Sequence, residues 1–330
     1  MRQISSFSTD REIDTVYFGG GTPTVLGIDR LCKLLSLIKK RFTLKEGCEI
    51  TVEVNPKTVN ALSLTDLKNA GFNRLSIGVQ ASDDSVLRSI GRIHSFDDAK
   101  ACIRDARSVG FANISADIIF ALPNQSSEAF KKCIYDIMST NPDHISAYSL
   151  QLEEDTPLYT RRDMLDFPDE ESEEAQYNSL CEILKSNGYL HYEISSFCKQ
   201  GFESRHNLNY WARNEYFGFG AAAHSFYNGK RFSNIADVQK YVKLSRGGLY
   251  APTDYDDAPF ITEPEAEEER IMLNLRTNRG ATIPEASRSA AQRIAELGYG
   301  DFDGEILTLN SRGFRVSNSI IAEIVAKGNF

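Results

Sequence analysis

The chain has 330 residues, of which 41% are hydrophobic and 25% are charged, a composition that is ordinary for a globular protein. Its net charge of −9 excludes a general electrostatic affinity for nucleic acid or anionic lipid, since both are negatively charged. No apolar run reaches the roughly 18 residues that a membrane-spanning helix needs, and the first ten residues lack the apolar core of a secretory signal. We therefore expect a cytoplasmic protein with no integral membrane segment and no nucleic-acid partner.

In the first 150 residues, short β-type runs alternate with segments whose apolar residues recur at helical spacing. A glycine followed by an aromatic residue ends three of these helical segments, at Gly71, Gly110 and Gly188, where a left-handed backbone would end a helix. The alternation predicts a parallel α/β sheet, open or closed into a barrel. The predicted strands cover residues 15–18, 50–54, 75–79, 114–120 and 145–150.

After residue 192 the composition changes. The stretch "HYEISSF" predicts one more strand, and the following segment, rich in Gly, Asn and aromatic residues, predicts irregular and antiparallel structure. Residues 251–270 are rich in proline and acidic residues, which predicts a linker into a small C-terminal unit. That unit resembles a winged helix, with helices near 265–276, 287–297 and 318–326 and a strand pair at 306–309 and 313–316.

Three successive strands carry small or polar residues on one face, and Glu53, Gln80 and Asp117 lie near their carboxyl ends. One such residue alone is more often structural. Three in register, beside the triple glycine at 19–21, predict a pocket for a polar ligand, because functional sites of α/β proteins lie at that edge. The glycine N–H groups suit a carboxylate or a phosphate, although their spacing matches no dinucleotide or P-loop pattern.

Two further segments carry candidate binding residues. Arg92 follows a helical stretch, and its guanidinium is either a solvated helix-end cation or a clamp for a ligand carboxylate. His206 lies among Tyr210 and Trp211 before a glycine-rich loop, so it is either structural or a ligand of a planar aromatic cofactor. His224 is a weaker second candidate.

The chain has six cysteines, and none forms a C-x-x-C or C-x-x-x-C pair. This spacing favours buried free thiols over disulfides or metal ligands. The cysteines are Cys32, Cys48, Cys102, Cys133, Cys181 and Cys198.

The chain resembles the oxygen-independent coproporphyrinogen III oxidase-like family of radical S-adenosylmethionine (SAM) proteins. The shared motifs run in the family's order from about residue 14 to the C-terminus, so the resemblance covers nearly the whole chain. They are "YFGGGTPT", "EVNP", "GFNRLSIGVQ", "DIIFALPNQ", "HISAYSLQLEEDTPLY", "RHNLNYW", "GFGAAAHS" and "EEERIMLNLR".

The resemblance implies an incomplete (β/α)6 barrel that lacks its first strand, in residues 1–200. It also implies a β-containing extension in residues 201–255 and a winged-helix-like domain in residues 256–330. SAM is expected across the carboxyl edge of the strands. The SAM contacts implied by matching position are Gly20, Gly21, Thr22, Glu53, Gln80, Arg92 and Asp117.

The stretch "HNLNYW" matches a motif that marks the haem-chaperone branch of this family. It implies haem binding by His206, Asn207, Tyr210 and Trp211. That branch is associated with delivery of haem to respiratory proteins, so haem-accepting proteins are the expected partners, and a homodimer stays open as the oligomeric state.

In this family a C-x3-C-x2-C loop upstream of the triple glycine holds a [4Fe–4S] cluster. This chain has no cysteine before Cys32 and none elsewhere with that spacing, so we expect no metal ligand within it. The favoured explanation is a true start further upstream, because the implied SAM contacts are all present. A fragment, or real loss of the cluster, are the alternatives.

The expected function is that of a haem chaperone that binds haem and SAM and delivers haem to acceptor proteins. One alternative is a coproporphyrinogen oxidase-type enzyme of porphyrin biosynthesis, and another is a truncated, inactive remnant. The motif "HNLNYW" favours the chaperone over the oxidase. The sequence leaves open whether the chain is an enzyme and whether SAM is cleaved.

Overall fold

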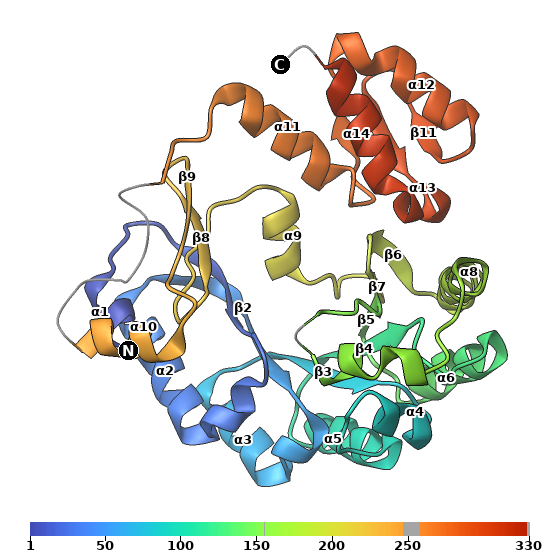
Figure 1. The fold of residues 1–330 in the computed structure, drawn as a ribbon. Helices are drawn as coiled ribbons and strands as arrows, with labels where there is room; N and C mark the ends of the chain where they lie inside the picture. The colour runs from blue at the N-terminus through green and yellow to red at the C-terminus, as the bar shows by residue number, and fades with distance from the viewer. Residues whose placement is uncertain (155, 247–257, 329–330) are drawn as a thin grey trace. The chain divides into compact units, whose positions relative to one another are not determined.

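The computed structural model describes residues 1–154, 156–246 and 258–328 (Figure 1). The chain forms two compact units. The first, here called the sheet unit, consists of Thr15–Lys33 and Gly47–Glu203. The second, here called the appended unit, consists of Met1–Asp14, Leu34–Glu46 and Ser204–Phe330.

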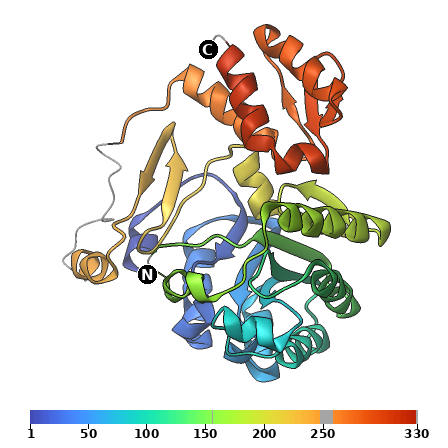
Figure 2. The ribbon, with the colours of Figure 1, turned by 45° about the vertical axis from the view of Figure 1, so that its right-hand side comes forward.

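A seven-stranded sheet with the order β1-β2-β3-β4-β5-β7-β6 forms the centre of the sheet unit. Strands β2 to β5 are parallel, whereas β7 pairs antiparallel with both β5 and β6. The strands are β1 (Ile13–Phe18), β2 (Leu44–Val54), β3 (Arg74–Gln80), β4 (Asn113–Phe120), β5 (His144–Ser149), β6 (Leu190–Glu193) and β7 (Ser196–Cys198). The sheet curves, with helices on its outer side (Figure 2), which confirms the predicted α/β half-barrel.

The helices of the sheet unit begin and end at residues whose chemistry fits those positions. Ser95 and Asp98 form the expected capping box of one helix, and Gly71, Gly110 and Gly188 have positive φ values of 106°, 93° and 83° at helix ends. The helices are α3 (Ala61–Ala70), α4 (Asp84–Ser89), α5 (Phe96–Ser108), α6 (Ser127–Ser139), α7 (Pro157–Thr160) and α8 (Glu170–Ser186), with 3-10 turns η1 (Pro23–Leu26), η2 (Pro56–Thr58) and η3 (Arg162–Met164). Helix α2 (Ile28–Arg41) begins in this unit, and its residues from Leu34 on belong to the appended unit.

The two faces of the sheet differ in chemistry. Along β2, β3 and β4, alternate residues such as Val52, Leu75 and Ile114 are apolar and fully buried. The residues between them point to the other side and are mostly polar. Register makes two rows of neighbours on that side, Thr51–Arg74–Asn113 and Glu53–Ser76–Ser115. This side, which also carries Asp117, is called the polar face below.

Residues 191–197, expected to form one strand, instead form parts of the β6–β7 hairpin with a turn between them. The expected irregular structure was also wrong at "RHNLNYW", because this stretch forms helix α9 (Arg205–Trp211). The side chain of Ser204 accepts a hydrogen bond from the backbone N–H of Asn207 and so caps the first turn of α9. This cap offsets the modest helix propensity of the residues that follow.

The appended unit contains a two-stranded hairpin of β8 and β9 and a three-stranded antiparallel sheet with the order β10-β12-β11. Its strands are β8 (His224–Tyr227), β9 (Lys230–Ser233), β10 (Ala281–Thr282), β11 (Gly300–Phe302) and β12 (Ile306–Leu309). Its helices, besides α9, are α1 (Arg2–Ser6), α10 (Val238–Arg246), α11 (Glu263–Asn274), α12 (Arg288–Glu296), α13 (Ser311–Arg315) and α14 (Ser317–Lys327), with a 3-10 turn η4 (Glu285–Ser287).

One predicted strand of this unit was wrong. Residues 313–316 lie in and just after helix α13, and the partners of β12 are β10 and β11. The side chain of Asn310 accepts hydrogen bonds from the backbone N–H groups of Arg312 and Gly313, which starts a helix where alternation suggested a strand. In the predicted linker, residues 251–257 lie outside the described residues, and a capping box of Thr262 and Glu265 begins α11.

Candidate functional site

The triple glycine follows β1 and lies against Glu53, the penultimate residue of β2. The hydroxyl of Tyr17 donates a 2.9 Å hydrogen bond to Oε1 of Glu53, and the backbone N–H of Gly20 also donates to this carboxylate. A Cβ atom at Gly19 would lie 2.5 Å from the Tyr17 ring and 2.8 Å from Glu53 Oε1. Only glycine therefore allows the chain to pass this carboxylate so closely.

The pKa of Glu53 differs from the ordinary value of a carboxyl group. Burial is the largest influence and, with repulsion by Asp117, raises the pKa of Glu53 to about 6, while the hydrogen bonds from Tyr17 and Gly20 oppose that rise. Burial and the same two carboxylates also raise the pKa of Tyr17, so its phenol stays a neutral donor. The Tyr17 hydroxyl is thus a neutral hydrogen-bond donor to Glu53, whose pKa lies near neutral pH.

Asn55 links three of the predicted SAM contacts at the same edge. Its Nδ2 donates to the Thr22 hydroxyl at 2.7 Å, and Nη1 of Arg92 donates to its Oδ1 at 3.3 Å. A Cβ at Gly78 would lie 2.8 Å from Nε2 of Gln80 and 3.0 Å from Asn55 Oδ1, so Gln80 belongs to the same cluster. Burial lowers the pKa of Arg92.

Asp117 lies on the polar face, where two serines hold its carboxylate. Ser76 Oγ donates to Oδ2 at 2.6 Å, and Ser115 Oγ lies 3.0 Å from Oδ1. Ser115 also contacts Nδ1 of His144 at 2.8 Å, and Nε2 of His144 contacts the Tyr192 hydroxyl at 2.8 Å. This hydrogen-bonded chain crosses from β4 to β6 and fixes the orientation of Asp117.

His144 is fully buried, and its pKa lies well below the ordinary value, first because of burial and then because of the nearby Arg74 charge. A neutral imidazole donates through one nitrogen and accepts through the other. Residues Tyr17, Asn55, His144 and Tyr192 therefore shape the site without having been singled out from the sequence. Asn55 could have been predicted from the sequence, because alternation along the strand puts its side chain on the same side as that of Glu53.

Helix α9 in the appended unit carries the four predicted haem residues. Nε2 of His206 lies 3.0 Å from the Tyr210 hydroxyl, and the two rings meet edge to face with centroids 4.8 Å apart. The Tyr210 ring also packs edge to face on Tyr216 at 4.6 Å. Burial, and then Tyr216, raise the pKa of Tyr210 to about 12, so its phenol is neutral at physiological pH.

The remaining two predicted haem residues have different surroundings. The backbone N–H of Asn207 is used in the cap of α9. Nε1 of Trp211 is buried and has no hydrogen-bond acceptor among the residues that the structure describes. An indole N–H without an acceptor is a donor that fits a ligand carboxylate, and the indole and phenol rings offer the flat apolar surface that a porphyrin needs.

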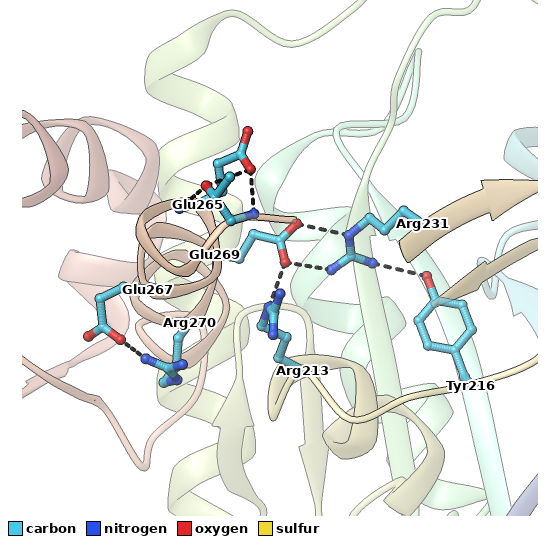
Figure 3. A network of polar contacts seen from close by, with 8 residues as sticks. Arg213, Tyr216, Arg231, Glu265, Glu267, Glu269 and Arg270 are labelled. Carbon is cyan, nitrogen blue, oxygen red and sulfur yellow. Dashed lines mark hydrogen bonds and ion pairs between the residues drawn. The ribbon is translucent and has the colours of Figure 1, made fainter. Parts of the chain in front are cut away.

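A charged network in the appended unit follows directly after α9 (Figure 3). Nε of Arg213 donates to Glu269 at 2.6 Å, and two nitrogens of Arg231 donate to the same carboxylate at 2.8 and 2.9 Å. Both guanidinium groups also lie 4.7 Å from the centroid of the Phe226 ring. The pKa of Glu269 is lowered, chiefly by the hydrogen bond from Arg231. The network joins α11, β9 and the residues after α9.

The residues present do not fit an iron–sulfur cluster. All six cysteines are free thiols, and in the described parts of the chain no three His, Cys, Asp or Glu side chains group together around a possible metal position. Burial raises the pKa of Cys102 and of Cys198 to about 12, which disfavours the thiolate that binds iron.

The residues at the strand edge do fit SAM. A Cβ at Gly20 or Gly21 would meet nothing within 4 Å, so the backbone there is open to a ligand, and acidic and amide groups stand beside it. A carboxylate such as Glu53 suits the cationic amine and sulfonium of SAM. Across residues 1–154, 156–246 and 258–328, no helix is long and apolar enough to span a bilayer.

Comparison with known proteins assigns the chain to a family. A family model described as the radical SAM superfamily matches residues 1–136. The heme chaperone HemW of Bacillus subtilis is 38% identical over 276 residues, covering 82% of this chain and 72% of that protein. The heme chaperone HemW of Lactococcus lactis is 31% identical over 340 residues, covering 98% of this chain and 88% of that protein.

The structure of coproporphyrinogen III oxidase (HemN) from Escherichia coli has the same fold, with a TM-score of 0.83 at 20% identity over 98% of this chain and 81% of that one. Fold and sequence together define a radical SAM protein. Within that class, the extent and identity of the two chaperone matches are decisive. The chain belongs to the HemW family.

Proposed function

We propose that this protein is a haem chaperone that binds haem and SAM and passes haem to acceptor proteins. The observation that carries the proposal is helix α9, which carries an imidazole, a phenol and an indole at His206, Tyr210 and Trp211 in a member of the HemW family. Neutral imidazole is a common axial ligand of haem iron.

The surroundings of the other histidines favour His206 as the haem ligand. His94 and His144 are buried. The ring of His191 stacks on Phe197 with centroids 4.1 Å apart, and its Nε2 is buried. Only His206 and the exposed His224 then present a ring to an external ligand among the five histidines of the chain.

We further propose a cytoplasmic protein whose acceptors are respiratory haem proteins, and SAM contacts at Gly20, Gly21, Thr22, Glu53, Gln80, Arg92 and Asp117. The names of the two HemW relatives support haem binding and leave the acceptor to experiment. Light scattering of the purified protein distinguishes a monomer from the alternative homodimer.

The proposal is tested by haem delivery. Protein loaded with one equivalent of haemin is mixed with the apo-form of a respiratory haem protein, and reconstitution is compared with that from albumin-bound haemin. We expect faster reconstitution from this protein. The chaperone role is refuted if reconstitution is no faster, or if the protein shows no saturable Soret band. Anaerobic conversion of coproporphyrinogen would favour the oxidase instead.

A further inference from the structure

Arg74, the first residue of β3, is a buried cation without an ion-pair or hydrogen-bond partner among the described residues. Its side chain points to the polar face, and the residue is 2% exposed. No described side chain forms an ion pair with it, and its buried Nε has no hydrogen-bond acceptor among the described residues. An unpaired buried charge is among the most unfavourable arrangements in a protein, because water no longer solvates it.

The two neighbours of Arg74 in its row also have buried polar side-chain atoms. Thr51 on β2 and Asn113 on β4 are its register partners, so the three side chains lie next to one another on the polar face. Thr51 Oγ1 and Asn113 Oδ1 are also buried polar atoms without a hydrogen-bond partner among the described residues. Three such groups in one row point to a shared ligand, since native structures leave few buried polar atoms unpaired.

The nearby carboxylates do not neutralise Arg74. Glu53 is held by Tyr17 and Gly20, and Asp117 is held by two serines, and neither forms an ion pair with the guanidinium. By contrast, Arg107 in the same unit pairs with Asp143 at 2.5 Å.

The positive charge of Arg74 influences titratable groups on three other strands of the sheet. It lowers the pKa of Tyr17 on β1, of His144 on β5 and of Cys198 on β7, in each case as a smaller influence than burial. A ligand at this position would therefore meet positive potential from a fixed guanidinium. The row lies at the amino ends of β3 and β4, several residues from Gln80 at the carboxyl end of β3.

We propose that Arg74, Thr51 and Asn113 form a binding site for a carboxylate group. The planar guanidinium binds a carboxylate through parallel hydrogen bonds, the Thr51 hydroxyl donates another, and the Asn113 amide donates when its Nδ2 faces the ligand. The carboxylate comes from a free organic acid or from the propionate of a bound porphyrin. The proposal stands apart from haem ligation by His206 and from the predicted SAM contacts.

The test follows the Nε–Hε resonance of Arg74 in the full chain by two-dimensional ¹H–¹⁵N NMR. The probes are succinate, for a free acid, and gallium protoporphyrin IX, for a propionate. We expect one of them to shift the Arg74 resonance saturably, while the resonance of Arg107 stays in place because Asp143 already pairs with it.

Two variants that keep the guanidinium make the test specific. Thr51→Val should weaken the binding about tenfold, since it removes one donor to a charged ligand. Asn113→Asp should abolish the shift and raise the melting temperature, because it supplies a carboxylate to Arg74 from the adjacent strand. The proposal is overturned if neither probe moves the Arg74 resonance, or if both variants bind the probe as tightly as the parent.

Discussion

Arg213 and Glu269 join helix α11 to the residues that directly follow α9 through a hydrogen bond of 2.6 Å. Arg213 lies two residues after Trp211 and adopts a left-handed backbone, with φ at 57°. A non-glycine residue in that conformation is held by its surroundings. The contact therefore fixes the carboxyl end of the proposed haem helix.

Replacement of Glu269 should destabilise the protein and weaken haem binding together. Glu269→Ala leaves Arg213 and Arg231 without their shared carboxylate, which we expect to lower the free energy of unfolding by about 2 kcal/mol. Urea unfolding and haemin titration measure the two effects. Glu267→Ala is the matched control on the same helix, because among the described residues Glu267 pairs just with Arg270, one turn away. It should change the free energy of unfolding by less than about 0.5 kcal/mol. Equal effects of both variants would contradict this role.

The raised pKa of Glu53 predicts a pH-dependent stability. The folded state keeps the proton of Glu53 up to about pH 6, whereas the unfolded state releases it nearer the ordinary carboxyl pKa of 4.5. The stability that this group contributes therefore falls as pH rises through that window. Glu53→Gln keeps an acceptor for Tyr17 and should be more stable than the parent at pH 8, by about 1 kcal/mol after allowance for partial exposure. At pH 4 the two proteins should unfold alike. A stability difference that does not change between pH 4 and pH 8 would disprove the assignment.

SAM binding should depend on the same carboxylate. A SAM amine and sulfonium gain from an ionised Glu53, so calorimetry should show affinity falling as the pH is lowered through 6, and Glu53→Gln should remove that dependence. Asp117→Asn should weaken binding about tenfold or more, because a charged contact is lost. Asp136→Asn, on α6, serves as a control. SAM affinity that ignores both Glu53 and Asp117 would refute the proposed contacts.

Iron–sulfur reconstitution of the 330-residue polypeptide should give no stoichiometric [4Fe–4S] spectrum. Its cysteines are dispersed and five of the six are buried, so three thiolates cannot converge on one cluster without unfolding. Anaerobic treatment with iron and sulfide, followed by absorbance and electron paramagnetic resonance, measures this. A full cluster signal that disappears in one of the six Cys→Ser variants would show that these cysteines can supply ligands.

The sequence predicted the parallel α/β part of the sheet because its signals are local, whereas the incomplete barrel was implied by the family resemblance. Alternation along β2 to β4 set the polar face, and Ser95 and Gly71 marked helix ends through backbone chemistry that acts within a few residues. The grouping of Glu53 with the triple glycine followed from the shared strand edge, since parallel strands bring their carboxyl ends together.

Features that depend on contacts between distant segments escaped prediction. In the sequence, Tyr17 belongs to an apolar predicted strand. Its role depends on the hydrogen bond from its hydroxyl to Glu53, which lies 36 residues away in the chain. Helix α9 is seven residues long, too short for a clear periodic pattern, and depends on its Ser204 cap. Likewise, α13 starts at the Asn310 cap although its residues alternate like a strand. Arg74 looked unremarkable until register placed it between Thr51 and Asn113.

The central claim is haem binding through His206, and a haemin titration followed at the Soret band tests it most directly. The parent protein should saturate near one equivalent, and His206→Ala should lose or shift the band because the axial imidazole is gone. His224→Ala, which changes the exposed histidine of the same unit, should bind like the parent. An unchanged spectrum and affinity in His206→Ala, or a loss confined to His224→Ala, would contradict the account.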